Sequence, residues 1–187
     1  MPSKTMKKIA ACALLACVTA TFLSNPAQGS ETTPLPGTVL AGQGTMRFFG
    51  LEVYQARLWV SPGFAPERYG DQPLALALTY QRNFTAQAIA KRSIEEMRRV
   101  APFSNEQAER WQAALQDALP DVKPGDTLTG IYRPGGGAVF RMGDKVVGEV
   151  ADPEFARLFF GIWLSPNTSE PALRQALLAS RSTAGSP

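Results

Sequence analysis

The stretch that decides the fold runs from Asp126 to Leu164 and reads DTLTGIYRPGGGAVFRMGDKVVGEVADPEFARLFFGIWL. Three apolar runs, at 127–132, 138–142 and 145–150, are separated by a glycine-rich loop and by the pair Gly143-Asp144. Glycine reaches the positive φ that the first central position of a type II′ turn requires, so this pair predicts a two-residue hairpin. The stretch therefore predicts strand, loop, strand, tight turn and strand.

A helix is expected directly after these strands. Asp152 can accept a hydrogen bond from a free backbone N–H, Pro153 has no N–H to leave unpaired, and Glu154 complements the helix dipole. Apolar residues cover most of the helix circumference: Phe155, Leu158, Phe159 and Ile162 on one face, with Phe160, Trp163 and Leu164 filling much of the rest. Such a helix must be buried on more than one side.

Residues 1–29 have the layout of a secretory signal peptide. Three lysines precede an apolar run from Ile9 to Leu23, and small residues follow, so we expect cleavage after Ala27 or Gly29. The run is too short and too poorly flanked for a membrane span. The sequence thus predicts a periplasmic or secreted protein.

An alternative reading of the leader is a lipoprotein processing box at Leu14-Leu15-Ala16-Cys17. The apolar residues Val18 to Leu23, which would follow the lipidated cysteine, argue against it. Attachment to a membrane is expected only if Cys17 is lipidated.

The chain without its leader carries balanced charge. All 16 acidic residues lie beyond Gly29, whereas three of the 19 basic residues precede it, so 16 of each sign remain. Nucleic-acid binding needs a surplus of lysine and arginine, and none is expected. Both cysteines lie in the leader and the chain has no histidine, which excludes histidine-based triads, thiol nucleophiles and the common zinc and haem sites. No metal or cofactor is expected.

Alternating runs upstream of the central stretch predict further strands. In the run 51–60, Tyr54 shares one dry face with the alternate apolar residues that follow it. In the run 74–81, large residues face one way and small residues the other, and we expect a helix or ligand against the small face. Gly42 and Gly44 indicate a bulge or a close approach of another group to the backbone.

Helix signals lie between and after these strands. Thr85 is expected to cap one helix, Ser104 and Gln107 form a capping box for a second, and Ser169 or Thr168 caps a last helix. Strands, two helices, strands and two helices predict an α+β domain with helices packed on a mostly antiparallel sheet. We place this domain at 38–179, after a tether at 30–37 and before a flexible tail at 180–187.

Several motifs resemble those of the bacterial chalcone isomerase-like family. They are Gly42-x-Gly44-x-x-Arg47, Val53-Tyr54-x-Ala56-x-Leu58-Trp59-Val60, Leu78-x-Tyr80-x-Arg82, Pro120-Asp121-Val122-x-Pro124-Gly125-Asp126 and Phe159-Phe160-Gly161-Ile162-Trp163-Leu164. The resemblance covers about 39–178 and implies a large antiparallel sheet backed by helices, with a ligand cleft between them. Its relatives include plant enzymes that cyclise chalcones and plastid proteins that bind fatty acids.

The resemblance implies a ligand site at Arg47 and Tyr54. In those relatives an arginine follows a Gly-x-Gly run, and Arg47 is similar to it although it lies one residue further on. Tyr54 is similar to the tyrosine that joins this arginine at a carboxylate, and Tyr80 is a weaker candidate. The plant enzymes also use a tyrosine and an asparagine about the next helix, and 85–100 holds neither.

Each candidate also has a purely structural interpretation: Arg47 can pair with Glu52 at a strand end, and Tyr54 and Tyr80 can be core residues. We expect a non-catalytic protein that binds a fatty acid or a similar amphipathic carboxylate. The alternatives are an isomerase of the chalcone isomerase type and a ligand-free scaffold whose cleft is filled by Phe and Trp side chains.

Overall fold

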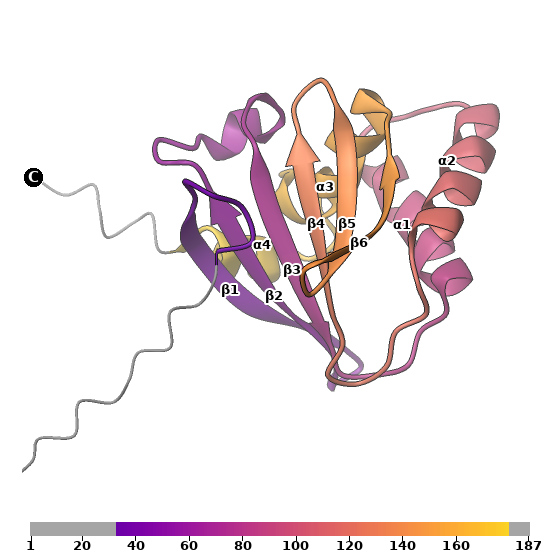
Figure 1. Cartoon of the computed structure of the whole chain (residues 1–187), viewed down its shortest axis with the longest axis horizontal. Coiled ribbons are helices and arrows are strands. Elements are labelled where there is room, and N and C mark those ends of the chain that lie inside the picture. Colours follow the sequence, from indigo (N-terminus) through magenta and orange to yellow (C-terminus); the bar gives the residue numbers. More distant parts are fainter. Residues whose placement is uncertain (1–32, 180–187) are drawn as a thin grey trace, which may run out of the picture. The chain divides into compact units, whose positions relative to one another are not determined.

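The computed structural model describes residues 33–179, so the predicted signal peptide, the Cys17 alternative and the tail at 180–187 lie outside the described residues. Six strands form one sheet in which each strand pairs antiparallel with the next along the chain (Figure 1). They are β1 (Val39–Phe48), β2 (Leu51–Val60), β3 (Leu74–Tyr80), β4 (Thr127–Arg133), β5 (Gly137–Met142) and β6 (Lys145–Val150). The predicted α+β class with an antiparallel sheet is confirmed.

The α-helices of the described residues pack on the sheet and on one another: the last two along the chain lie behind the sheet in the view of Figure 1, and the first two stand beside its β6 edge. These helices are α1 (Ala86–Val100), α2 (Asn105–Ala118), α3 (Pro153–Leu164) and α4 (Pro171–Leu177), and a short 3-10 helix, η1 (Pro66–Asp71), lies between β2 and β3. Helix α3 lies against β4 and β5 on one side and α1 on the other. This position explains why its apolar residues extend around most of its circumference.

The pair α1 and α2 forms the connection between β3 and β4. These strands are neighbours in the sheet although 46 residues separate their ends. Two helices packed against each other return the chain to the end of the sheet that it left, so the next strand runs antiparallel. The helices therefore add a layer without changing the strand order.

Local signals in the sequence are mostly confirmed. The side chain of Thr85 accepts a hydrogen bond from the N–H of Ala88, and Ser104 and Gln107 form the reciprocal capping box. Asp152 caps α3. Gly143 takes a φ of 58° in the turn between β5 and β6, as the hairpin prediction requires.

The predicted start of the last helix is wrong. Helix α4 begins at Pro171 with Glu170 as its N-cap, and no side chain caps it. The hydroxyl of Thr168 instead donates to the carbonyl of Ile162 at 2.6 Å and accepts from the N–H of Glu170 at 3.1 Å. Thr168 therefore fixes the loop after α3, because its hydroxyl group joins a carbonyl of the last turn of α3 to the backbone at Glu170.

The prediction for the two faces of β3 is also wrong. Leu74, Leu76, Leu78 and Tyr80 belong to the main core beneath the helices. The small residues Ala75 and Ala77 face the other way, where Leu35 packs against a smaller cluster. The large side chains reach the helix layer because that layer supplies the larger apolar surface.

Gly42 and Gly44 allow helix α4 to lie close to the backbone of β1. A Cβ atom on Gly42 would lie 2.3 Å from the carbonyl oxygen of Ala176, and one on Gly44 would lie 2.8 Å from a methyl group of Leu173. The pairing of β1 with β2 also shifts register beside Gly42. Both predicted roles of these glycines, a bulge and a close backbone approach, are confirmed.

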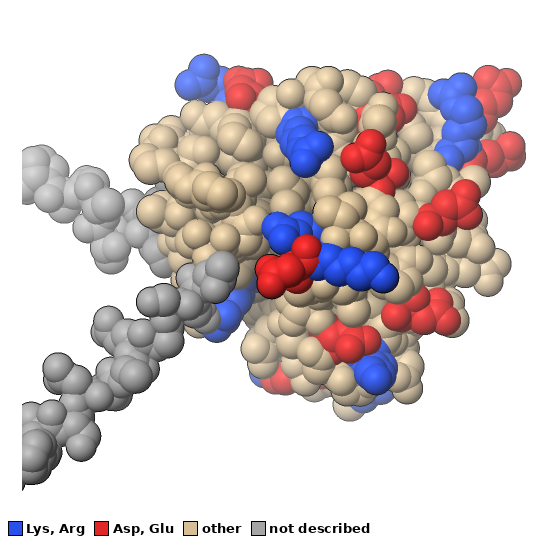
Figure 2. All heavy atoms as spheres, viewed as in Figure 1, with Lys and Arg blue, Asp and Glu red and all other residues tan. Residues whose placement is uncertain are grey.

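The open face of the sheet carries no large field of one charge sign. Figure 2 shows Lys and Arg interspersed with Asp and Glu over the face that is turned toward the viewer. Within residues 33–179, no helix combines the length and the apolar character needed to cross a bilayer.

Candidate functional site

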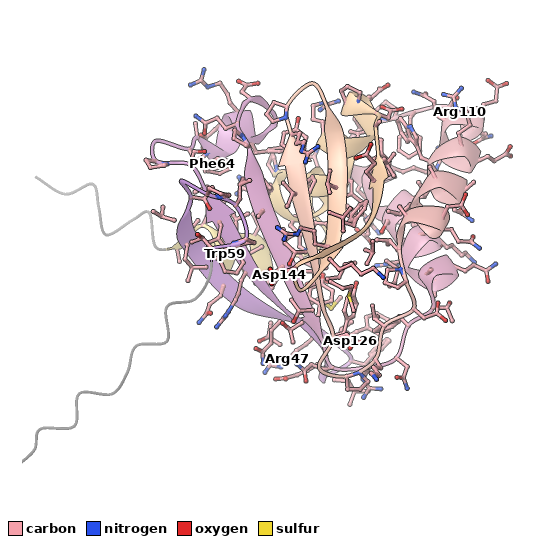
Figure 3. All side chains as sticks on the ribbon, viewed as in Figure 1. Arg47, Trp59, Phe64, Arg110, Asp126 and Asp144 are labelled. Atoms are coloured by element: carbon pink, nitrogen blue, oxygen red, sulfur yellow. The ribbon has the colours of Figure 1, made fainter. Side chains whose placement is uncertain are left out.

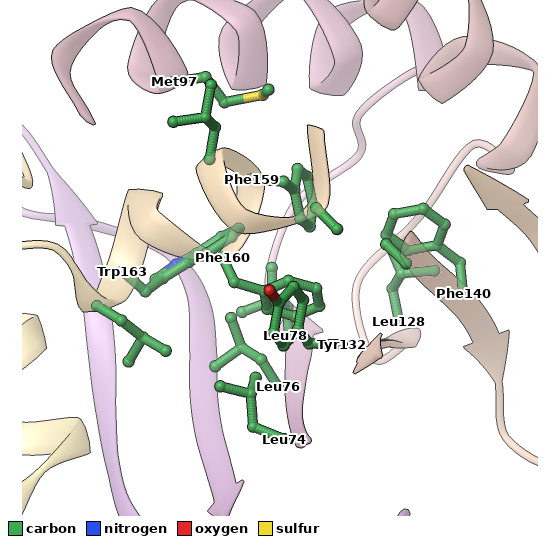
Figure 4. Packing of buried hydrophobic residues seen from close by; sticks show 14 of the residues in the cluster. Leu74, Leu76, Leu78, Met97, Leu128, Tyr132, Phe140, Phe159, Phe160 and Trp163 are labelled. Atoms are coloured by element: carbon green, nitrogen blue, oxygen red, sulfur yellow. The ribbon is translucent and has the colours of Figure 1, made fainter. Parts of the chain in front are cut away.

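A pocket of about 270 Å³ lies between the sheet and the helices. Leu78 and Leu128 form part of its floor on β3 and β4, and Phe159, Ile162 and Trp163 of α3 form one wall. Figure 4 shows how Phe159 and Trp163 lie between α1 and the leucines of the sheet. Helix α1 closes the other side, and Ser169 and Glu170 contribute from the loop before α4. The wall is mainly apolar, as in most small-molecule sites.

Tyr54 lines this pocket and is tied to its α3 wall. The indole Nε1 of Trp163 donates a hydrogen bond to the Tyr54 hydroxyl oxygen at 3.0 Å. Burial is the main cause that raises the pKa of Tyr54 to about 12, with smaller contributions in the same direction from Glu170 and Glu96. The Tyr54 hydroxyl therefore stays protonated at neutral pH, and its own hydrogen is free to be donated.

Tyr80 also lines the pocket. Its ring lies 6.0 Å from that of Tyr54, edge to face, and the residue is only 4% exposed. Among the described residues, no group is hydrogen-bonded to its hydroxyl group. Burial, and next the neighbouring Tyr54, raise the pKa of Tyr80. The structure thus brings together two of the three predicted site residues.

Arg47 lies outside the pocket, so its expected position in the cleft is wrong. Its side chain is 57% exposed, and its guanidinium pairs with Glu52 on the adjacent strand. Figure 3 shows Arg47 at the end of the β1–β2 hairpin. The alternative interpretation, an exposed pair with Glu52 at a strand end, is the one that the structure shows.

Strand geometry explains the position of Arg47. Met46 pairs with Tyr54 and lines the pocket, and successive side chains of a strand point to opposite faces. A register shift follows between Met46 and Arg47, so that Arg47 pairs with Glu52 and Val53 is left as the extra residue. Because Arg47 lies one residue further along than the arginine of the family pattern, its side chain points to the face of β1 that is turned away from the pocket.

The charged end of the pocket comes from residues that the sequence analysis did not single out. Arg92, Ser93 and Glu96 line it from α1, and Glu170 lines it from the loop before α4. The guanidinium Nη2 of Arg92 lies 2.6 Å from Oε1 of Glu96, whose side chain is only 7% exposed. A signal for Glu96 was present: it follows Ser93 by three residues and Ile89 by seven, beside the apolar stripe of the helix.

The pocket offers hydrogen-bonding groups together with apolar surface. Within 33–179, no group of three or more metal-ligating side chains is close enough together to hold an ion. Two neutral tyrosine hydroxyls, two carboxylates and one guanidinium can position a polar group, while the apolar walls can hold a chain or ring. This combination suits an amphipathic molecule.

Comparison with known proteins gives the family. The model of the family described as chalcone isomerase-like matches residues 32–179. The chain belongs to the chalcone isomerase-like family. This confirms the resemblance that the sequence motifs indicated.

Two known proteins are similar to this chalcone isomerase-like protein, one in sequence and one in fold. It is 29% identical over 126 residues to an uncharacterized protein of Haemophilus influenzae, an alignment that covers 67% of this chain and 60% of the relative's length. Its fold is similar to the crystal structure of the Arabidopsis thaliana fatty-acid binding protein AtFAP1, with a TM-score of 0.60 and 13% identity. That match covers 78% of this chain and 89% of AtFAP1. At this identity the likeness establishes the fold.

Proposed function

We propose that this protein is an exported, non-catalytic binding protein that takes the apolar part of an amphipathic molecule of the fatty-acyl type into its pocket. The observation that carries the proposal is the cavity of about 270 Å³ with apolar walls between sheet and helices. AtFAP1, which shares the fold, is a fatty-acid binding protein, and this supports a ligand with an acyl-type apolar chain.

The size of the pocket fits one chain better than a large ligand. Small-molecule pockets generally span about 300–1,000 Å³, so this cavity of about 270 Å³ is slightly smaller than that range. Each methylene moved from water into the pocket contributes about 0.8 kcal/mol, a factor of about four in affinity. A chain of moderate length therefore supplies most of the binding free energy, and the polar end of the pocket sets orientation.

Particular residues of the pocket argue against the two alternative functions, a ligand-free scaffold and a chalcone isomerase-type enzyme. A scaffold without ligand was expected to have its cleft filled by aromatic side chains, yet Phe84, Phe159 and Trp163 line an open cavity. A chalcone isomerase-type reaction would need a cation free to stabilise a phenolate, whereas the pocket's guanidinium, Arg92, is already paired with Glu95 and Glu96.

A substitution that fills the pocket entrance tests the binding proposal. Ala88 lines the pocket and is exposed on α1, so Ala88→Trp should occupy part of the cavity without disturbing the core. Gln87→Trp adds the same side chain at the neighbouring exposed position, which is not part of the pocket, and serves as the control. We expect Ala88→Trp to weaken uptake of the neutral fluorescent probe N-phenyl-naphthylamine at least about tenfold, the loss of a few buried methylene equivalents.

A homologous series of alcohols supplies the second measurement. Affinity should rise about fourfold with each added methylene until the chain fills the pocket, and then level off. Equal probe uptake by the native chain and Ala88→Trp, or an affinity that ignores chain length, would refute the proposal.

Export is the part of the proposal that rests on the leader. The layout of residues 1–29 supports it, and the mass of the purified mature protein tests it. Loss of the first 27 or 29 residues is expected. A chain that begins at a lipid-modified Cys17 would support the lipoprotein alternative, and an uncut chain in the cytoplasm would contradict export.

A further inference from the structure

We infer that the pocket selects an amphipathic ligand whose head group is uncharged or cationic, such as a hydroxyl or an amine, and disfavours a free carboxylate. The inference rests on the proposed function, since it names the head group for the same pocket. It is carried by the charges of the pocket end: Glu96 and Glu170 outnumber the one lining cation, Arg92.

Glu96 is a buried carboxylate among the residues that line this end of the pocket. The residue is 6% exposed, and its Oε1 lies 2.6 Å from Nη2 of Arg92. Its Oε2 lies 3.4 Å from Nε of Arg99. Glu96 therefore offsets the charge of Arg92 at the pocket, and leaves no surplus of positive charge there for an anionic head group.

Arg92 is already occupied by carboxylates. Besides Glu96, it pairs with Glu95 through Nη1 at 3.4 Å. A ligand carboxylate that approached this guanidinium would add a further negative charge beside two existing ones, and like charges at such distances oppose ionisation or binding. Arg92 therefore holds Glu96 in place and is a poor anchor for an anion.

Glu170 adds a second acceptor to the pocket end. Its side chain is partly buried, lines the pocket, and has neither an ion pair nor a hydrogen bond among residues 33–179. Its backbone N–H donates to the hydroxyl of Thr168, which holds the backbone of this residue in place beside the pocket. A hydroxyl or ammonium hydrogen of a ligand fits an unpaired carboxylate better than a second anion does.

The tyrosines complete the match to a hydroxyl group. Tyr54 accepts from Trp163 and can donate its own hydrogen, and Tyr80 has no hydrogen-bond partner in the described part of the chain. A ligand hydroxyl can accept from a tyrosine and donate to a glutamate at the same time. The pocket end thus has donors and acceptors for a neutral polar group.

A matched set of ligands tests the inference directly. Decanol, decylamine and decanoate share one tail and differ in head group, and each displaces N-phenyl-naphthylamine from the mature, delipidated protein if it binds. We expect decanol and decylamine to bind at least about tenfold more tightly than decanoate near neutral pH, the ratio expected for one uncompensated charge at a partly wetted site.

Three glutamine variants connect that preference to the glutamates. Glu170→Gln removes a charge that has no structural partner, so the fold should be kept while the preference for decanol over decanoate falls about tenfold. Glu96→Gln should act in the same direction. Glu95→Gln is the control, since Glu95 also pairs with Arg92 on α1 but does not line the pocket, and it should leave the preference unchanged.

The possible outcomes are distinguishable. Tighter binding of decanoate than of decanol, or an equal response of the preference to Glu95→Gln and Glu170→Gln, would overturn the head-group inference while leaving the binding proposal in place. Failure of the probe and of all three ligands to bind would overturn the proposed function, and the inference with it.

Discussion

Asp152 connects helices α2 and α3 through one carboxylate, and its replacement by alanine should destabilise the fold by more than a cap alone would. Its Oδ1 accepts from the N–H of Phe155 at 2.9 Å, and its Oδ2 accepts from Nε1 of Trp111 at 2.7 Å. Loss of an N-cap costs about 1 kcal/mol. Trp111 is 2% exposed, so its unpaired N–H costs a further 1–3 kcal/mol or so. The expected decrease in the free energy of unfolding is about 2–4 kcal/mol.

A double-mutant cycle separates the two contributions. Asp152→Ala, Trp111→Phe and the double variant should give a coupling free energy of about 1.5–3 kcal/mol, the range for a hydrogen bond to a charged group. Urea unfolding followed by circular dichroism measures it, since Trp111→Phe changes the fluorescence signal itself. Asp152→Ser keeps an oxygen for the cap but is too short to reach Trp111, so it should lose mainly the second contribution.

Glu154 provides the matched control on the same first turn of α3. Its carboxylate accepts from Gln107 Nε2 at 3.0 Å, and the pair is exposed. Glu154→Ala should therefore cost less than about 1 kcal/mol. A coupling below about 0.5 kcal/mol between positions 111 and 152, or a loss at Glu154→Ala as large as at Asp152→Ala, would refute the reasoning.

Two further predictions concern the glycine beneath α4 and a pocket tyrosine. Gly42→Ala should lower the free energy of unfolding in urea by about 1–3 kcal/mol, because the new Cβ would lie 2.3 Å from the carbonyl oxygen of Ala176. Gln43→Ala, at the exposed neighbouring position, should change stability little. An unchanged unfolding midpoint for Gly42→Ala would contradict the prediction and show that α4 can move away from β1 at little cost. Burial raises the pKa of Tyr54 from 10 to about 12, so between these values the folded protein keeps a proton that the unfolded chain releases, and stability should fall as the pH rises through this window. Urea unfolding at several pH values checks this fall, which Tyr54→Phe should make shallower; an identical pH profile for both chains would contradict it.

Much of the fold could be predicted from the sequence because its signals are local. The caps at Thr85, Ser104 and Asp152 each join a side chain to a backbone group three residues away, and the turn at Gly143 depends on one dihedral angle. Such interactions need no distant partner. The alternation along β2 and the apolar circumference of α3 likewise identified which elements would be buried.

The site could be predicted only in part. Tyr54 and Tyr80 line the pocket because strand alternation alone sets their common face with the core. The sequence did not identify Arg92, Glu96 and Glu170 as neighbours, since they come from α1 and from a loop 74 residues beyond Glu96. Their contact depends on how α1, α3 and α4 pack together.

The sequence by itself determined the strands, the helices, most of their caps and the balance of charge, because each of these depends on residues near one another in the chain or on composition. Only the tertiary structure decided which cation reaches the pocket. Arg47 follows the pocket-lining Met46 by one residue and therefore points to the other face of β1, where it pairs with Glu52, while the packing of α1 on α3 brought Arg92 to the pocket together with its partner Glu96. Alternation places Met46 and Arg47 on opposite faces of β1, but which face the helices cover is decided by packing between segments far apart in the chain.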